Sequence, residues 1–186
     1  MQSPRIRTFT VFAILFIAIL HNVQAQPTSS KLNFKSLSPF ASALETLQKQ
    51  LKYNFKSIGL LRRAMTHASF SEENNKAFSI FGASVIETCV SFQLLSKDID
   101  VSSKELNRRL SQISNVESSC AVDALRLGLH KVVRVSPKTN SSAPAVVCGA
   151  FRAIFGAIAI DIGNSDAAGN VFWNLHGGDL GVAVAL

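Results

Sequence analysis

A nearly unbroken apolar run from residue 145 to residue 162 constrains the fold more than any other part of this 186-residue chain. Only Arg152 and Asp161 carry charge in this run. A helix that is apolar on all sides is usually the buried centre of a bundle. Small residues in the run, such as Gly149 and Gly156, would let neighbouring helices approach closely. The run therefore predicts a helical domain built around one central helix.

The rest of the chain also has helical rather than strand periodicity. Apolar residues recur at helical spacing, and no strand pattern of useful length is present. Ser42 followed by Glu45 resembles a helix N-cap. The other expected helices span 42–53, 57–68, 76–95, 103–113, 116–129 and 166–175. We predict an all-α fold.

The first 25 residues have the layout of a cleavable secretory signal. Two arginines precede an apolar run over 11–20, and Val23-Gln24-Ala25 places small or medium residues before a cut between Ala25 and Gln26. The apolar run rises only about 15 Å as a helix, about half of the hydrocarbon thickness of a bilayer, so a membrane span is not expected. A mitochondrial transit peptide is the alternative, although such peptides are amphipathic. We expect the secretory pathway, as the endoplasmic reticulum lumen or secretion.

The domain organisation follows from these segments. A polar stretch, 26–38, reads as a linker. The expected domain covers 39–176, and a short tail, 177–186, follows it. The net charge of +7 and the pI near 9.7 are compatible with polyanion binding but do not bear on the fold.

Two helical stretches carry a family resemblance. Residues 75–86, Asn-Lys-Ala-Phe-Ser-Ile-Phe-Gly-Ala-Ser-Val-Ile, are similar to the pattern N-x-x-L-E-F-L-G-D-A-V-L. Residues 149–157 are similar to D-x-x-E-A-x-x-G-A. Residues 55–70 are similar to F-x-x-x-x-L-L-x-x-A-L-T-H-x-S-Y, and residues 125–129 to R-R-L-G-L. In this order, the four blocks resemble the ribonuclease III nuclease domain.

The resemblance implies a nuclease whose carboxylates hold divalent metal, but this chain lacks all four of them. The four positions are occupied by Ser79, Ala83, Gly149 and Arg152. Magnesium takes oxygen ligands, and an arginine puts a permanent positive charge where the cation would lie. We therefore expect no catalytic residues, no metal ligands and no cofactor. Arg152 is predicted to point into a groove lined by the other three positions.

Other acids could in principle rescue a metal site. Glu87 is two helical turns beyond Ser79, and Asp161 lies near the end of the central helix. Glu72 and Glu73 precede the helix 76–95, where acids favour the helix dipole. The strict geometry of magnesium argues against a site made from these residues.

Basic residues and histidines have both structural and functional interpretations. A phosphate-binding surface could be formed by Arg62, Arg63, Lys104, Arg108, Arg109, Lys131 and Arg134, although solvated helix faces are the simpler interpretation. His67 lies in the T-H-x-S block, where hydrogen bonds that fix a helix end are expected. His130 and His176 have no cysteine or acid at metal-ligand spacing and are expected to be ordinary surface or core residues.

Two further features depend on the compartment. Cys89, Cys120 and Cys148 fall on apolar stripes, so all three are expected to be buried and reduced, although an oxidising lumen would permit one pair. Asn140-Ser141-Ser142 is an N-glycosylation sequon in a Pro/Ser-rich loop, which matters only if the chain enters the secretory pathway.

The family resemblance also implies dimerisation. Ile80 stands where the family often has an aromatic residue that plugs into the partner subunit, so a smaller apolar knob is expected here. The expected partner is a second copy or a ribonuclease III-like subunit. The leading hypothesis is a non-catalytic protein that acts by interaction. The alternatives are an endoribonuclease in RNA processing, with an unrecognised site or an active partner, and a lumenal double-stranded RNA-binding module.

Overall fold

A computed structural model describes residues 38–176, and this part of the chain is helical, with one isolated bridge between Thr66 and Arg134. The all-α prediction is confirmed. The helices are α2 (Pro39–Leu51), α3 (Ile58–Ala64), α4 (Lys76–Lys97), α5 (Ser103–Ser114), the π-helical turn η1 (Val116–Cys120), α6 (Ala121–Arg126), the 3-10 turn η2 (Leu129–Lys131), α7 (Pro144–Ile162) and α8 (Ser165–His176). The expected signal segment and tail lie outside the described residues.

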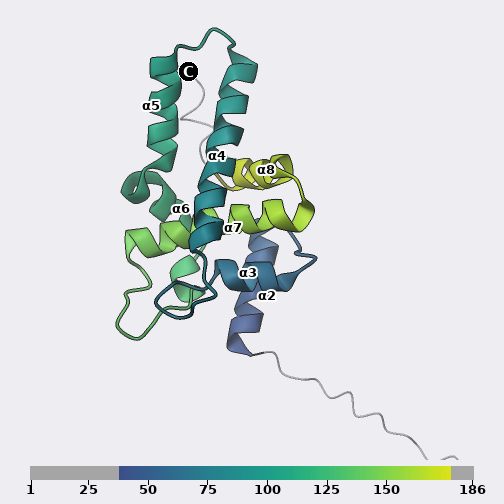
Figure 1. The fold of residues 1–186 in the computed structure, drawn as a ribbon, viewed down its shortest axis with the longest axis vertical. Coiled ribbons are helices and arrows are strands. Elements are labelled where there is room, and N and C mark those ends of the chain that lie inside the picture. Colours follow the sequence, from purple (N-terminus) through teal and green to yellow (C-terminus); the bar gives the residue numbers. More distant parts are fainter. Residues whose placement is uncertain (1–37, 177–186) are drawn as a thin grey trace, which may run out of the picture. The chain divides into compact units, whose positions relative to one another are not determined.

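Helix α7 is the centre of the bundle, as its composition predicts. It crosses α4 and also packs against α3, α6 and α8, while α4 and α5 run side by side as a hairpin (Figure 1). Phe151 and Phe155 are buried in α7 and meet Phe172 of α8 edge to face. Burial of these rings removes large apolar areas from water, which stabilises the fold and holds α8 against α7.

The ends of the helices have identifiable caps. Pro144 begins α7, where a missing N–H costs nothing, and Gly163 ends it at a φ of 78°. Ser102 begins α5 by accepting a hydrogen bond from the Glu105 N–H at 3.2 Å. Asn115 caps η1 by accepting from the N–H groups of Glu117 and Ser118.

Some predicted boundaries are wrong. The N-cap of α2 is Ser38, followed by Pro39, rather than Ser42, because a Ser-Pro pair satisfies both the cap and the first helical position. The predicted helix 57–68 ends at Ala64, and the predicted helix 116–129 is divided into η1, α6 and η2. These errors arise in short segments, where long-range contacts override helical periodicity.

Helix α4 is less buried than its apolar pattern suggests. Phe78 and Val85 are buried, whereas Phe81 and Phe92 are 43% and 69% exposed. By length and composition alone, α4 and α7 would each pass as a membrane-crossing segment, a test that a buried core helix also passes. For α7 its place in the core accounts for the composition, whereas α4 keeps an apolar face outside the core.

Candidate functional site

The crossing of α4 and α7 brings the two motif-bearing helices into backbone contact. A Cβ added to Gly82 would lie 1.8 Å from the carbonyl oxygen of Arg152, and one added to Gly156 would lie 2.3 Å from that of Phe78. No side chain fits at either glycine, so the pair fixes how closely the helices approach. The close approach brings the facing sides of α4 and α7 together.

The four positions that the resemblance singled out lie at or beside this crossing. A Cβ built on Gly149 would be 3.9 Å from the Ser79 hydroxyl, so these residues face each other across the two helices. Ser79, Ala83, Gly149 and Arg152 are all partly buried. The two motif positions that the resemblance assigns to one metal site, Ser79 and Gly149, therefore do lie close together in the structure.

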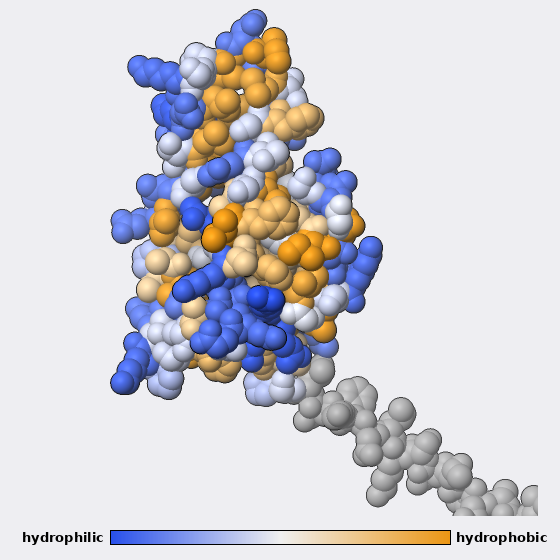
Figure 2. Space-filling view, viewed as in Figure 1, coloured by the Kyte–Doolittle hydropathy of each residue, from blue (hydrophilic) through white to orange (hydrophobic). Residues whose placement is uncertain are grey.

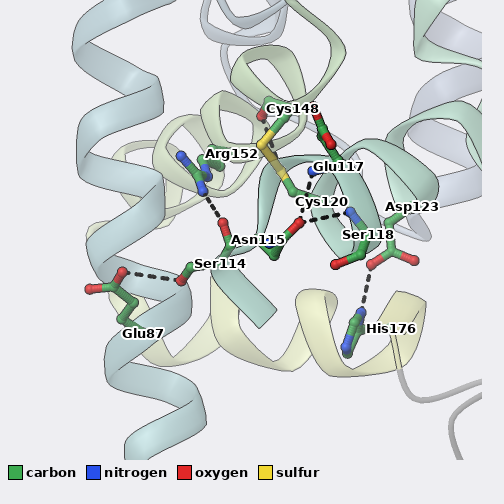
Figure 3. Close-up of a disulfide and its surroundings, with 10 residues drawn as sticks. All are labelled: Glu87, Ser114, Asn115, Glu117, Ser118, Cys120, Asp123, Cys148, Arg152 and His176. Carbon is green, nitrogen blue, oxygen red and sulfur yellow. Dashed lines mark hydrogen bonds and ion pairs between the residues drawn. A yellow bond between two sulfur atoms is a disulfide. The ribbon is translucent and has the colours of Figure 1, made fainter. Parts of the chain in front are cut away.

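Arg152 is held by a backbone carbonyl rather than by an acid. Its Nη2 donates to the Ser114 carbonyl oxygen at 2.7 Å, which ties α7 to the end of α5 (Figure 3). The Ser114 hydroxyl donates to Glu87 of α4 at 3.2 Å. Glu87 is thus bound to Ser114, and Ser114 links an acid on α4 to the arginine on α7.

The acids considered for a rescued metal site do not gather there. Asp161 accepts hydrogen bonds from Tyr53 Oη at 2.7 Å and from the Lys56 and Ser57 N–H groups at 2.8 Å each. Its carboxylate serves the start of α3. Within residues 38–176 no three His, Cys, Asp or Glu side chains come together as a metal site would require.

The hydrogen bonds to Asp161 also set its acidity. Burial raises the pKa of the Asp161 carboxyl, but the bonds from Tyr53, Ser57 and Lys56 outweigh it, so the pKa lies below its usual value. Burial and the same carboxylate raise the pKa of Tyr53 far above its ordinary value. The Asp161 carboxylate is therefore ionised in the folded protein, where it accepts the N–H hydrogen bonds at the start of α3.

Two of the cysteines form a disulfide, so the prediction of three reduced cysteines is wrong. Cys120 at the end of η1 is bonded to Cys148 in α7, and both are buried (Figure 3). Cys89 is the free thiol, and burial raises its pKa. An apolar stripe cannot reveal pairing, because the two helices meet only in the fold. The disulfide joins α7 one residue before Gly149, beside the motif positions.

His176 has an acid partner that the sequence does not reveal. Its Nδ1 lies 2.6 Å from Asp123 Oδ2, and its ring stacks on Phe172 at a centroid distance of 5.0 Å (Figure 3). Asp123 Oδ1 also accepts a hydrogen bond from Arg126 Nη2 at 3.0 Å. The pair joins α6 to the end of α8 and is buried, which agrees with the expectation of a core histidine. His130 is partly buried, and its Nδ1 has no hydrogen-bond partner among residues 38–176.

The T-H-x-S block has the structural role that was expected. The Thr66 hydroxyl donates to the Arg62 carbonyl oxygen at 2.7 Å, and the His67 ring nitrogen Nδ1 lies 2.9 Å from the Ser69 hydroxyl. The His67 N–H donates to the Arg134 carbonyl oxygen. These bonds end α3 and attach the following loop to the segment around Arg134.

The basic residues do not form one surface. On α5, Arg108 and Arg109 both pair with Glu105, at 2.5 and 2.7 Å, and those hydrogen bonds lower the pKa of Glu105 to about 2. Arg62 and Arg134 instead lie over the Phe40 ring, at 6.0 and 4.3 Å from its centroid. Figure 2 shows hydrophilic residues gathered over α3 and the loop after it. The remaining lysines, Lys104 and Lys131, are exposed.

The predicted glycosylation residue is accessible. Asn140 is exposed in the loop before α7, and its side-chain oxygen accepts from the Ser142 N–H at 2.9 Å. Its occupancy stays a prediction, as does cleavage between Ala25 and Gln26, which lie outside the described residues.

The outer face of α4 carries exposed apolar side chains. Ile80 is 73% exposed, and Phe81 and Phe92 lie on the same helix. Figure 2 shows apolar residues exposed along α4. Ile80, for which the motif resemblance implies an intersubunit position, is therefore an outward-facing apolar side chain.

Comparison with known proteins gives agreement over most of the helical domain. The family description Ribonuclease-III-like matches residues 57–176. The chain is 53% identical over 185 residues to the Arabidopsis thaliana protein NUCLEAR FUSION DEFECTIVE 2, covering 96% of this chain and 97% of that protein.

Bacterial ribonucleases are more distant relatives. Ribonuclease 3 of Albidiferax ferrireducens is 31% identical over 70% of this chain, and the match spans 58% of the bacterial protein. The nuclease domain of ribonuclease III from Campylobacter jejuni superposes with a TM-score of 0.67 at 28% identity, covering 71% of this chain and 94% of that one. The chain thus matches most of the isolated bacterial nuclease domain but little more than half of the full-length Albidiferax ferrireducens ribonuclease 3.

Proposed function

The chain belongs to the ribonuclease III-like family, and we propose that it is a non-catalytic member that acts by interaction. The observation that carries the proposal is the presence of an arginine, Arg152, at a motif position where a carboxylate would be expected. In the family, as the motif resemblance implies, this position holds a metal-binding carboxylate. Here a guanidinium occupies it and donates to the Ser114 carbonyl oxygen.

The chemistry of ribonuclease III explains why these changes matter. Divalent metal generates the attacking hydroxide by lowering the pKa of bound water and neutralises charge in the transition state. Ser79 offers only a neutral hydroxyl, Ala83 and Gly149 offer no ligand, and Arg152 repels a cation at this position. At about 4 Å and an effective dielectric near 20, such a like-charge contact costs about 4 kcal/mol per unit charge of the cation.

Metal binding gives one test of this proposal, which does not require an activity assay. We expect titration calorimetry of the wild-type protein with Mn²⁺ to show no specific site. The matched variant carries Ser79→Glu, Ala83→Asp, Gly149→Asp and Arg152→Glu. Gly149 has space for a side chain, because its Cβ would make only an ordinary contact with Ser79 at 3.9 Å. Stoichiometric Mn²⁺ binding by the wild type would refute the proposal.

We propose a role in nuclear fusion, as karyogamy of the polar nuclei, by similarity to the Arabidopsis relative. The similarity extends over 97% of that protein's length, so it includes more than the shared domain. Disruption of the gene in its host should leave polar nuclei unfused, and the variant Ser79→Ala should restore fusion because the serine has no catalytic duty. Failure of Ser79→Ala to rescue, with normal protein levels, would contradict a non-catalytic role.

We propose that the mature chain begins at Gln26 and resides in the secretory pathway. Three features support this location: the signal-like segment 1–25, the Cys120–Cys148 disulfide and the exposed sequon at Asn140. Disulfides persist in oxidising compartments and are rare in the cytosol. N-terminal sequencing and glycosidase treatment test this; a mitochondrial protein without glycan and with reduced cysteines would contradict it.

We propose that the functional unit is a homodimer formed through the outer face of α4. The nuclease domain of the Campylobacter jejuni enzyme has a structurally flexible region involved in dimer formation, and Ile80 projects from α4 here. Ile80→Asp should convert the dimer to a monomer in sedimentation experiments. Ile99→Asp is the matched control, because Ile99 is 78% exposed but follows α4. A monomeric wild type would refute the proposal.

A further inference from the structure

A cavity of about 250 Å³ lies between α4 and α8. Val85 of α4 is buried and Cys89 is half-buried in its lining. A Cβ added to Gly169 of α8 would lie only 2.5 Å from the Cys89 sulfur, so the two helices already touch beside the cavity. A closer approach of α8 to α4 therefore cannot fill the space.

The size and the apolar lining of the cavity favour aliphatic side chains as its occupant. Its volume is smaller than the roughly 300–1,000 Å³ of most small-molecule sites, and larger than the engineered cavity of about 150 Å³ that holds benzene. Phe92, which is 69% exposed, adds an apolar ring to the lining. One or two aliphatic side chains match this volume.

Polar side chains complete the lining of the cavity. They are Thr88, Gln93, Ser165, Asp166 and Asn170. The amide groups of Gln93 and Asn170 each offer a hydrogen-bond donor and an acceptor. A peptide in an extended conformation brings backbone N–H and C=O groups that require such partners. The cavity therefore suits a peptide segment with small aliphatic side chains better than a hydrocarbon ligand.

The segment 180–186 of this chain has the sequence that such a cavity requires. It reads Leu-Gly-Val-Ala-Val-Ala-Leu and has no charged side chain. The larger residues alternate with glycine or alanine, so an extended conformation places both leucines and both valines on one face. The alternation is too short to predict a sheet. It does give the segment one apolar face that could pack into a cavity.

The end of α8 brings the segment within reach of the cavity. Asn170 and Asp166 lie about 9 and 15 Å back along the helix from His176, its last residue. Two glycines, at 177 and 178, suit a reversal of the chain after α8. If Leu180 returns to the level of His176, an extended rise of about 3.3 Å per residue puts Val182 and Val184 about 7 and 13 Å back along α8.

We propose that residues 180–186 fold back along α8 and place Val182 and Val184 in the cavity between α4 and α8. Because the segment belongs to the same chain, its effective concentration is high and a weak intrinsic affinity is sufficient. Docking would cover Cys89 and connect the end of α8 to α4. The site is separate from the proposed dimer contact, since Ile80 lies about 18 Å from Phe92 along α4.

The rate of Cys89 alkylation by iodoacetamide in the folded, unreduced chain reports whether the cavity is occupied. Cys89 is the one free thiol, because Cys120 and Cys148 form the disulfide. A chain that ends at Gly178 should react about tenfold faster than the full chain, since it lacks the tethered segment.

Two matched pairs of substitutions test which face of the segment is docked. Val182→Asp with Val184→Asp should react as fast as the shortened chain, because charged side chains are disfavoured in an apolar cavity. Ala183→Asp with Ala185→Asp adds the same charge on the opposite face and should react like the wild type. Ile80→Asp should also leave the rate unchanged, so failure of the proposed homodimer does not affect this test.

A peptide of residues 179–186, added to the shortened chain, gives a second readout. It should slow alkylation and change the fluorescence of Trp173, the one tryptophan of the chain, about one turn after Asn170 in α8. If the shortened chain does not fold, the two pairs of substitutions decide the test. Equal rates for the full and shortened chains, or equal acceleration by both pairs, would overturn the proposal. Protection that grows with protein concentration would identify a second copy as the occupant and would also overturn it.

Discussion

Arg152 and Arg134 are both partly buried arginines, but the protein satisfies them differently. Arg152 donates to the Ser114 carbonyl oxygen at 2.7 Å, beside the contact of α4 with α7. Arg134 lies between the rings of Phe40 and Phe70, donates to one hydroxyl, and has a buried Nε with no partner among residues 38–176. Arg152 therefore joins two helices through a hydrogen bond. Arg134 joins α2 to the loop after α3 mainly through its contacts with the two rings.

The largest expected effect comes from a substitution at the contact of α4 with the Arg152 backbone. Gly82→Ala places a Cβ 1.8 Å from the Arg152 carbonyl oxygen, so α4 and α7 must separate. We expect a loss of more than about 3 kcal/mol in the free energy of unfolding, measured by urea denaturation.

Gly59→Ala is the matched control for this substitution. Its Cβ would meet only Ser57 at 3.7 Å, within α3. Since alanine is favoured over glycine in a helix by about 0.5–1 kcal/mol, this variant should be slightly stabilised. Equal destabilisation of both variants would contradict the close helix crossing.

The second prediction concerns the disulfide, which joins η1 to α7 beside Arg152. Cys120→Ser with Cys148→Ser should cost about 2–4 kcal/mol, because the bond closes a loop with a sequence separation of 28. In thermal unfolding, addition of reductant should lower the stability of the wild type by the same amount. Reductant should not change the stability of the double variant, which has no disulfide. Detection of three reactive thiols in the unfolded, unreduced protein would show that the bond is absent.

The third prediction concerns α3, which carries Arg62. Asp161→Asn keeps the shape of the side chain but weakens the hydrogen bonds from Tyr53 and from the Lys56 and Ser57 N–H groups. We expect a loss of about 1–3 kcal/mol in the free energy of unfolding at neutral pH.

The pH dependence gives a second readout of Asp161. Its pKa is lower in the folded chain than in the unfolded chain, so its contribution is present above the unfolded value and is lost as pH falls. Wild-type stability should therefore decrease below about pH 4, near the ordinary pKa of aspartate. Asp161→Asn should lack this part of the decrease. Identical pH profiles would show that the carboxylate makes no net contribution.

The smallest effect is expected at Arg152 itself. Arg152→Gln removes the bond to the Ser114 carbonyl oxygen and should cost about 1 kcal/mol. Urea denaturation measures this loss. An unchanged free energy of unfolding in Arg152→Gln would show that the bond makes no net contribution.

The sequence predicts the central helix and the position of the motifs well. The apolar run 145–162 corresponds to α7 (Pro144–Ile162), and the predicted start of 76–95 is the start of α4. Both helices are long, and their boundaries are set by local signals, a proline and a C-cap glycine in α7. The similarity of the motifs places Ser79 opposite Gly149, as the structure does.

What the sequence could not predict depends on contacts between distant residues. Cys120 pairs with Cys148, and His176 pairs with Asp123, across separations of 28 and 53 residues. The contacts of Arg134 with Phe40 and Phe70 combine residues of α2, a loop and the segment after η2. Charge alone also grouped Arg108 and Arg109 with Arg134, although the first two share an ion pair with Glu105. Only the fold distinguishes arginines paired with an acid from one that has no acid partner within residues 38–176.

The most direct test of the account is incubation of the purified mature protein with duplex RNA, with and without magnesium. Because the metal-binding carboxylates are replaced by Ser79, Ala83, Gly149 and Arg152, we predict no magnesium-dependent cleavage at any protein concentration. A bacterial ribonuclease III is the positive control. Cleavage that copurifies with the protein, stops on addition of a chelator and changes with Ser79→Ala would contradict the central claim.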